Sequence, residues 1–364
     1  MESDSSSSEE GAPPSPQVDL PPPEGPFPVL KLPLVALHEV LNLHDPGELL
    51  HLSRVSKKSR LSVKAYTSRF TYRQSINLRD WKDHIIETID HQKSYRYPKV
   101  HTWSGAPHRW GRYIPDEAGP ITEAIEEWSD VFHKPKTSIY LEYAFHIRPI
   151  LEVVKRLELY MEEVEIWNDF YARDNPELFR FAMEQCKEAE KLTWSMHAPY
   201  NFRIEPPIRF QCERFEAGES NFGVTADNLM EFFGDCKEVD ISIPIPFENL
   251  NTFLIQWIAG CRIQFFRIWL FSTKLPEVPP MGPIFQGIED YRVVQKVKLS
   301  KKQNGLFKFK TAYIIKNVDG REATIAWDKE MFILECGEVE EYGEEEDEPE
   351  DEQQDEQEND EEDN

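Results

Sequence analysis

Histidines and cysteines are the residues of this 364-residue chain best suited to chemistry, and their spacing matches no catalytic or metal-binding motif. The ten histidines form no HExxH sequence, which would place two zinc ligands on one helix face. The nearest approach is His101-Thr-Trp and His108-Arg-Trp. A loop that packs its indole rings is the default interpretation, and a ligand or aromatic cage is the alternative. Gly-rich phosphate loops and a Gly-x-Ser-x-Gly elbow are also missing. We therefore predict no catalytic residue, no metal site and no cofactor.

The cysteines indicate an intracellular protein, cytoplasmic or nuclear. They form no CxxC pair and leave one over: Cys186, Cys212, Cys236, Cys261 and Cys336. We expect buried, reduced thiols rather than a disulfide framework. The N-terminal MESDSSSSEE is polar and acidic, unlike a secretory or transit peptide. Apolar stretches such as Phe253–Ala259 are far shorter than the roughly 20 residues that cross a bilayer, so we expect no membrane partner.

The acidity of the chain is concentrated at its two ends. Residues 338–364 hold 18 Asp or Glu and residues 1–26 hold six, and neither segment contains Lys or Arg. Subtracting those 24 from the formal net charge of −26 leaves −2 for residues 27–337. A nearly neutral body argues against nucleic acid as a partner, because that binding depends on basic residues. Both ends have little to bury and are predicted to be disordered.

Order is predicted to begin at Phe27 with two short leucine-rich helices. Leu34, Leu37 and Leu41 have helical spacing. Asp45, Pro46 and Glu48 then form a helix start in which each of the two acidic residues can accept from the other's amide. The second helix carries Leu49, Leu50, Leu52 and Val55. So small a module is expected to complete its apolar core with a partner.

The segments FPVLKLP (27–33), ALHEVL (36–41), DPGELLHLS (45–53) and SKKSR (56–60) resemble an F-box, in the variant of the large nematode-expanded group of F-box proteins. An F-box docks on the Skp-type linker subunit of a cullin–RING ubiquitin ligase. The resemblance implies that the apolar contacts come from Leu32, Pro33, Leu37, Val40, Leu41, Leu49, Leu50, Leu52 and Val55. It places Ser56, Lys57 and Arg60 at the family's polar positions.

The chain departs from the F-box pattern at two places. Leu34 and Val35 stand where many F-boxes have an acidic residue, and Ser59 stands where a Trp often follows the basic pair. The alternative interpretation is an ordinary helical hairpin that caps the domain behind it. A basic run from Arg54 to Arg73, with seven Lys or Arg and no acidic residue, is typical of a solvated helix face. A sharper hypothesis is that it meets an acidic surface, either the linker subunit or the protein's own C-terminal tail.

The middle of the chain repeats a strand and a helix. Strand-like runs centre near Leu141, Ile166, Trp194, Phe215, Ile241, Ile268 and Val293, which are 21 to 28 residues apart. Helix-like segments between them are Pro149–Leu159, Pro176–Cys186, Thr225–Cys236 and Asn249–Cys261. This period predicts a leucine-rich-repeat-like array in which each unit buries its apolar side against the next. A compact α/β domain with a parallel sheet and crossover helices is the competing interpretation.

Three further segments resemble the type 2 F-box-associated region, which is taken to contact substrates: TADNLM (225–230), CKEVDI (236–241) and LNTFLIQWIAG (250–260). A hairpin after them is predicted from the residues alone. Phe309–Asn317 and Arg321–Trp327 flank Val318-Asp319-Gly320, and an Asp-Gly between two β-rich runs favours a tight turn. We expect this hairpin to cap the array.

The predicted fold class is therefore α/β: a helical F-box, a leucine-rich-repeat-like strand–helix array, a β-hairpin cap and disordered acidic ends. The predicted boundaries are 1–26 leader, 27–70 F-box, 71–135 transition region, 136–300 array, 301–337 cap and 338–364 tail. The expected function is a non-catalytic adaptor that joins the linker subunit and its cullin complex to a target protein, for which no binding residue is predicted. The alternatives are an acidic-tail interaction protein or chaperone for a basic partner such as a histone, and an enzyme whose residues are distant in sequence.

Overall fold

The computed structural model describes residues 29–78, 85–90, 118–168, 175–198, 202–218, 224–225, 228–242, 249–269, 281–299, 307–327, 331–337 and 340–341. The two acidic ends, apart from residues 340–341, and the His/Trp repeat at 101–110 lie outside these residues, so those predictions stay predictions. The helices are η1 (Val29–Lys31), α1 (Leu34–Leu41), α2 (Pro46–Val55), α3 (Lys57–Thr67), α4 (Ala118–Val131), α5 (Ala144–Arg156), α6 (Pro176–Cys186), α7 (Leu229–Phe233), α8 (Leu250–Ile258) and α9 (Met281–Ile284).

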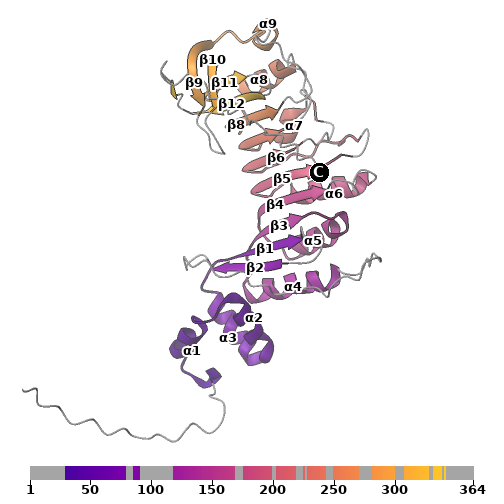
Figure 1. Cartoon of the computed structure of the whole chain (residues 1–364), viewed down its shortest axis with the longest axis vertical. Coiled ribbons are helices and arrows are strands. Elements are labelled where there is room, and N and C mark those ends of the chain that lie inside the picture. The colour runs from indigo at the N-terminus through magenta and orange to yellow at the C-terminus, as the bar shows by residue number, and fades with distance from the viewer. Residues whose placement is uncertain are drawn as a thin grey trace, which may run out of the picture.

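The strands join one mixed sheet within the described part of the chain. They are β1 (Tyr72–Leu78), β2 (Ile85–Asp90), β3 (Lys136–Leu141), β4 (Met161–Asn168), β5 (Lys191–Met196), β6 (Arg214–Ala217), β7 (Glu238–Ile241), β8 (Phe265–Trp269), β9 (Tyr291–Leu299), β10 (Phe307–Lys316), β11 (Glu322–Trp327), β12 (Met331–Cys336) and β13 (Glu340–Glu341). Their order across the sheet is β13-β9-β10-β11-β12-β8-β7-β6-β5-β4-β3-β1-β2. Helices α4 to α8 are stacked along one side of it (Figure 1). The α/β class is confirmed.

The seven predicted strand centres all fall in strands, β3 to β9. From β3 to β8 the strands are parallel and follow one another in chain order. The predicted hairpin is also present as the antiparallel pair β10–β11, with Gly320 at a positive φ of 81° in its turn. The seventh strand, β9, does not continue the parallel series. It pairs antiparallel with β10 on the far side of the hairpin.

Two rows of buried side chains run through the parallel strands in register. One row is Ile139, Val164, Leu192, Phe215, Val239 and Phe266; the other is Leu141, Ile166, Trp194, Ala217, Ile241 and Ile268. Each strand therefore places two apolar side chains under the helices, where they join the main core. Successive units bury their apolar surface against each other, which explains why the spacing of the strands was readable from the sequence.

The predicted helix starts are confirmed at two places. Asp45 Oδ1 accepts from the Glu48 amide at 2.7 Å and Glu48 Oε2 accepts from the Asp45 amide at 3.0 Å, which completes the capping box of α2. Asn175 Oδ1 accepts from the Leu178 amide at 2.9 Å at the start of α6. The predicted helix from Thr225 begins later, at Leu229.

The two ends of the parallel series are closed by elements that the sequence did not reveal. At one end β1 pairs parallel with β3, and β2 pairs antiparallel with β1. These strands and α4 come from the segment predicted as a transition region. At the other end β12 pairs antiparallel with β8. Side chains of β12 alternate between the main core (Phe332, Leu334) and a second core (Met331, Ile333) on the opposite face of the sheet.

Replacing Leu192 by Ala should test how strongly the buried rows hold the array together. The side chain is 1 % exposed at the centre of one row, so its truncation should lower the free energy of unfolding by about 2–5 kcal/mol. Thr193→Ala on the same strand, whose side chain lies on the other face, is the control and should change stability by less than about 1 kcal/mol. Urea unfolding followed by circular dichroism measures both; equal losses would contradict the assignment of faces.

Candidate functional site

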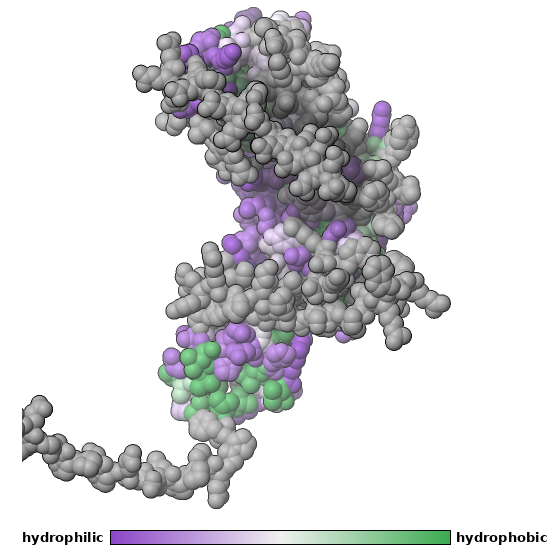
Figure 2. Space-filling model, in the orientation of Figure 1, coloured by the Kyte–Doolittle hydropathy of each residue, from purple (hydrophilic) through white to green (hydrophobic). Residues whose placement is uncertain are grey.

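The N-terminal helices α1, α2 and α3 present an unusual amount of apolar surface. Five of the twelve large hydrophobic side chains that are exposed in the described residues lie here: Leu34 (64 %), Val35 (75 %), Leu43 (82 %), Val55 (74 %) and Leu61 (60 %). We call these five residues the apolar patch. Figure 2 shows hydrophobic atoms gathered over α1–α3 at one end of the molecule. A concentration of this kind on a small module indicates a surface that another protein covers.

The module nevertheless has a core of its own. Leu37, Leu41, Leu49 and Leu50 are buried together with Val63 and Tyr66 of α3. Tyr66 also donates from its hydroxyl to Asn42 Oδ1 at 3.0 Å, which ties α3 to the end of α1. Helix α3 therefore completes the small core that it shares with the two predicted helices, α1 and α2. It is capped by Ser56, whose Oγ accepts from the Ser59 amide at 3.1 Å.

The residues expected to contact the linker subunit fall into three groups by exposure. Pro33, Val55, Ser56 and Lys57 are exposed; Leu32, Val40, Leu52 and Arg60 are half-buried; Leu37, Leu41, Leu49 and Leu50 are buried. The buried four build the module, so they support a contact surface without forming it. Leu34, Val35, Leu43 and Leu61 were not predicted as contacts, although Leu34 and Val35 are the positions at which the chain departs from the F-box pattern.

Four of the seven basic residues between Arg54 and Arg73 form ion pairs with acidic residues of the same chain. Arg54 pairs with Glu127 of α4 at 2.6 Å. Asp130, also in α4, accepts from Arg60 at 2.7 Å and from Lys64 at 2.6 Å. The same junction carries a buried hydrogen bond of 2.6 Å from Thr67 Oγ1 to the Val131 carbonyl.

One further member of the run, Arg73 on β1, pairs with Glu162 of β4 at 2.5 Å. These contacts fasten α2, α3 and β1 to the strand–helix body. The hypothesis that the run meets an acidic partner or the tail is thereby weakened, because Arg54, Arg60, Lys64 and Arg73 already have acidic neighbours.

The ion pairs at this junction shift the pKa values of their carboxyl groups. Hydrogen bonding from Arg54 lowers the pKa of Glu127, against the opposing effect of burial. Burial alone would raise the pKa of Asp130, but hydrogen bonds from Lys64 and Arg60 outweigh it, so the pKa is lowered. Both carboxylates are thus stabilised in the ionised form by the contact between the helical module and α4.

The face of the sheet opposite the helices is a second candidate surface, which we call the open face. Its side chains alternate with the buried rows on β3 to β8 and include Tyr140, Glu163, Glu165, Trp167, Thr193, Glu216 and Asp240. Tyr140 donates to Glu163 Oε2 at 2.8 Å, and Trp167, 46 % exposed, donates to Glu165. The aromatic side chains among them, Tyr140 and Trp167, are of the type enriched at protein interfaces, whereas acidic residues are depleted there.

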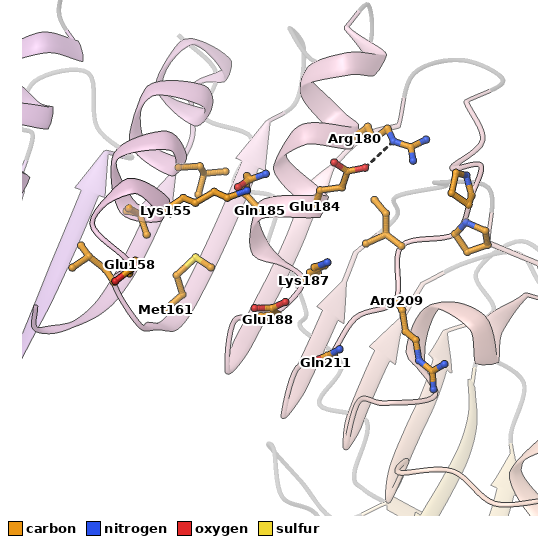
Figure 3. A pocket seen from close by; sticks show the side chains of 16 residues that line it. Lys155, Glu158, Met161, Arg180, Glu184, Gln185, Lys187, Glu188, Arg209 and Gln211 are labelled. Atoms are coloured by element: carbon orange, nitrogen blue, oxygen red, sulfur yellow. Dashed lines mark hydrogen bonds and ion pairs between the residues drawn. The ribbon is translucent and has the colours of Figure 1, made fainter.

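A groove on the helix side, of about 690 Å³, lies between the C-terminal ends of α5 and α6 and residues 206–211 (Figure 3). Charged groups line it, several of which are paired. Arg180 pairs with Glu184 at 2.9 Å, and Arg209 hydrogen-bonds Asp235. The pKa of Glu158 is lowered by a hydrogen bond from Lys134, which lies outside the groove. Nothing in this arrangement identifies a reaction.

The described residues show neither a metal cluster nor a membrane-spanning helix. Within them, no cluster of three or more His, Cys, Asp or Glu is placed to hold a metal ion. The five cysteines are free thiols, and burial raises the pKa of Cys186 to about 12. None of the helices that the structure describes is both long and apolar enough to span a bilayer.

Comparison of the chain with protein-family models, with curated proteins and with solved structures gave no match. Functional inference therefore rests on the two surfaces and on the resemblance of the N-terminal segments.

Neutralising the α4 carboxylates with Glu127→Gln and Asp130→Asn should lower stability at neutral pH and not in acid. A carboxyl group whose folded pKa is depressed stabilises the fold above its unfolded pKa, near 4, and loses that effect as the pH falls through the folded value. We expect the double variant to be about 1 kcal/mol less stable at pH 7, since each of these partly exposed pairs contributes about 0.2–1 kcal/mol.

The difference should vanish below about pH 3, where the wild-type carboxyl groups are protonated too. Urea unfolding at a series of pH values, with Glu152→Gln as the control, measures this. Glu152 makes a long 3.6 Å pair with Arg148 within its own helix, α5, so its removal should have little effect at any pH. A double variant as stable as wild type at pH 7 would contradict the role of the junction.

Proposed function

We propose that this protein is a non-catalytic substrate-recognition adaptor of an SCF-type cullin–RING ubiquitin ligase. In this proposal the helical module of residues 29–67 is an F-box that binds the Skp-type linker subunit. The strand–helix array presents its open face to a target protein. The observation that carries the proposal is the apolar patch, whose residues lie between and directly after the segments that resemble an F-box.

The exposure of apolar side chains on α1–α3 supports docking of this module on a partner more than a role as a simple cap of the strand–helix body. A hairpin that only capped the body would turn its apolar side chains inward, as Leu37, Leu49 and Leu50 do. Here the module buries four leucines and still exposes three leucines and two valines. Both interpretations of the sequence contribute: α2 and α3 pack on α4 through the ion-paired junction, and the apolar patch remains outside it.

The body supports the leucine-rich-repeat-like interpretation. Its parallel strands follow chain order and the helices lie along one side, whereas a doubly wound sheet would have helices on both faces. An array of this kind leaves one face of its sheet open over several strands. We propose that the target lies on that face, around Trp167 and the neighbouring carboxylates.

The proposed mechanism is proximity. Binding of the linker subunit at one end and of the target along the array places the target beside the ubiquitin-charged enzyme, which raises its effective concentration. The chain itself then supplies no acid, base or nucleophile. Lysines of the target are modified by other subunits of the complex.

Leu34→Asp combined with Val55→Asp should abolish binding of the linker subunit and leave the chain folded. Both side chains are solvent-exposed in the free protein, so charge costs little there. Burying two carboxylates in an apolar interface costs several kcal/mol, so binding should weaken by at least about 100-fold. Titration of the purified linker subunit by isothermal calorimetry measures the affinity, and circular dichroism reports the fold.

Val318→Asp is the matched control, because Val318 is 71 % exposed at the opposite end of the molecule. It should bind the linker subunit as wild type does. Leu49→Asp would be uninformative, since Leu49 is 2 % exposed and a carboxylate there would disrupt the module itself. Wild-type affinity of a folded Leu34→Asp/Val55→Asp chain would refute the F-box assignment. Removing residues 338–364 should leave this binding unchanged, whereas an acidic-tail chaperone would lose its partner.

Trp167→Ala should reduce recovery of the target without affecting the linker subunit. Exposed aromatic side chains of this size are frequent energetic centres of interfaces, where truncation costs 2 kcal/mol or more, roughly a 30-fold loss of affinity. Affinity purification with quantitative mass spectrometry of wild type, Trp167→Ala and Leu34→Asp/Val55→Asp separates the two surfaces. Ile255→Ala is the control, because Ile255 is equally exposed, at 45 %, but belongs to helix α8. Unchanged recovery of every co-purified protein by Trp167→Ala would remove the open face as the target site.

A further inference from the structure

Strands β9 and β10 carry a second run of basic residues. Between Tyr291 and Lys316 there are eight Lys or Arg and no Asp or Glu. Six of them lie on the described strands: Arg292, Lys296 and Lys298 on β9, and Lys308, Lys310 and Lys316 on β10. In a body of nearly neutral charge, this is a local excess of positive charge at one end of the sheet.

Lys298 and Lys308 are direct neighbours across the β9–β10 pair. They alternate with Val297, Leu299 and Phe309, which turn into the second core, so the two lysines lie on the outer side of the strands. Lys296 and Lys310 follow two residues further along the same strands. We call Lys296, Lys298, Lys308 and Lys310 the lysine ribbon.

The edge of the sheet beside this ribbon is formed by the start of the acidic tail. Strand β13 pairs antiparallel with β9, and the register places Glu340 opposite Lys298 and Glu341 opposite Val297. Residues 342–364 continue from this point with 15 acidic residues and no basic one. The tail therefore leaves the folded body next to the ribbon.

The first basic run, Arg54–Arg73, is at the other end of the sheet. Ten strand-to-strand steps separate β9 from β1, which at about 4.8 Å each is on the order of 50 Å. A flexible chain of the tail's length has a root-mean-square reach of roughly 27 Å. The run also has acidic neighbours of its own on α4 and β4.

We propose that residues 342–364 bind, within the same molecule, to the lysine ribbon of β9 and β10. Because β13 anchors the tail at the edge of the ribbon, the effective concentration of carboxylates there is in the millimolar range or higher. The tail then covers a surface whose positive charge would attract polyanions.

Zero-length cross-linking with a water-soluble carbodiimide tests this contact in the full chain. The reagent joins a carboxylate to an amine only where the two touch, and mass spectrometry identifies the linked peptides. We expect links from residues 344–363 to Lys298, Lys308 and Lys310. Their yield should fall several-fold between 0.1 M and 1 M salt, as the Debye length falls from about 10 Å to about 3 Å.

A triple change of Lys298, Lys308 and Lys310 to Gln should remove these links, and the same change at Lys58, Lys155 and Lys187 is the matched control. Mixing ¹⁵N-labelled and unlabelled chains distinguishes links within one molecule from links between two. Tail links spread over all exposed lysines, or links found only between two molecules, would overturn the proposal.

A truncated chain that ends at residue 341 gives a second measurement that does not depend on lysine variants. Removing the tail while keeping β13 should raise the rate at which Lys308 and Lys310 are acetylated by acetic anhydride several-fold. Lys58, Lys155 and Lys187 should react at unchanged rates. Equal acetylation of Lys308 and Lys310 in both chains would overturn the proposal.

Discussion

The structure depends on one constraint: a strand–helix unit of this size cannot bury its own apolar face. Each parallel strand from β3 to β8 contributes two buried side chains to rows that continue only through the next strand in register. A stack built in this way has two open ends, and each end would expose a strand edge and half of a core. The elements at both ends of the array cover these strand edges and the exposed part of the core.

The two ends are closed by different physical means. At the N-terminal end, β1 and β2 extend the sheet, α4 covers the core, and ion pairs from Arg54, Arg60 and Lys64 fasten the helical module to α4. At the C-terminal end, β12 reverses direction against β8 and supports a second core on the opposite face. Arg267 lies where the open face meets this core: it pairs with Asp240 and lies 4.9 Å from the ring of Trp269 and 5.7 Å from that of Phe307.

This difference explains what could be predicted from the sequence. The seven strand centres were found because the alternation of apolar and polar residues repeats with the unit length, as in Leu192, Thr193 and Trp194. Strand β12 (MFILEC) was missed because four successive side chains are buried, two in each core, so it shows no alternation. The basic residues of α2 and α3 are typical of a solvated face in the sequence because the acidic partners of Arg54 and Arg60, Glu127 and Asp130, are about seventy residues away. The contact site is predicted as nine apolar and three polar residues, but which of them are buried, half-buried or exposed depends on where α3 packs.

The same layout separates the surfaces proposed for binding. The apolar patch lies beyond the N-terminal end of the sheet, the open face runs along its length, and the lysine ribbon with the start of the tail lies at the C-terminal end. Charge screening over about 10 Å isolates the two ends of the sheet electrostatically. A body of in-register strands is also stiff, because slipping any strand by one residue would move its buried pair to the open face. Such a body would hold the apolar patch and the open face at a fixed separation, which the proposed adaptor function requires because the target must lie within reach of a second enzyme.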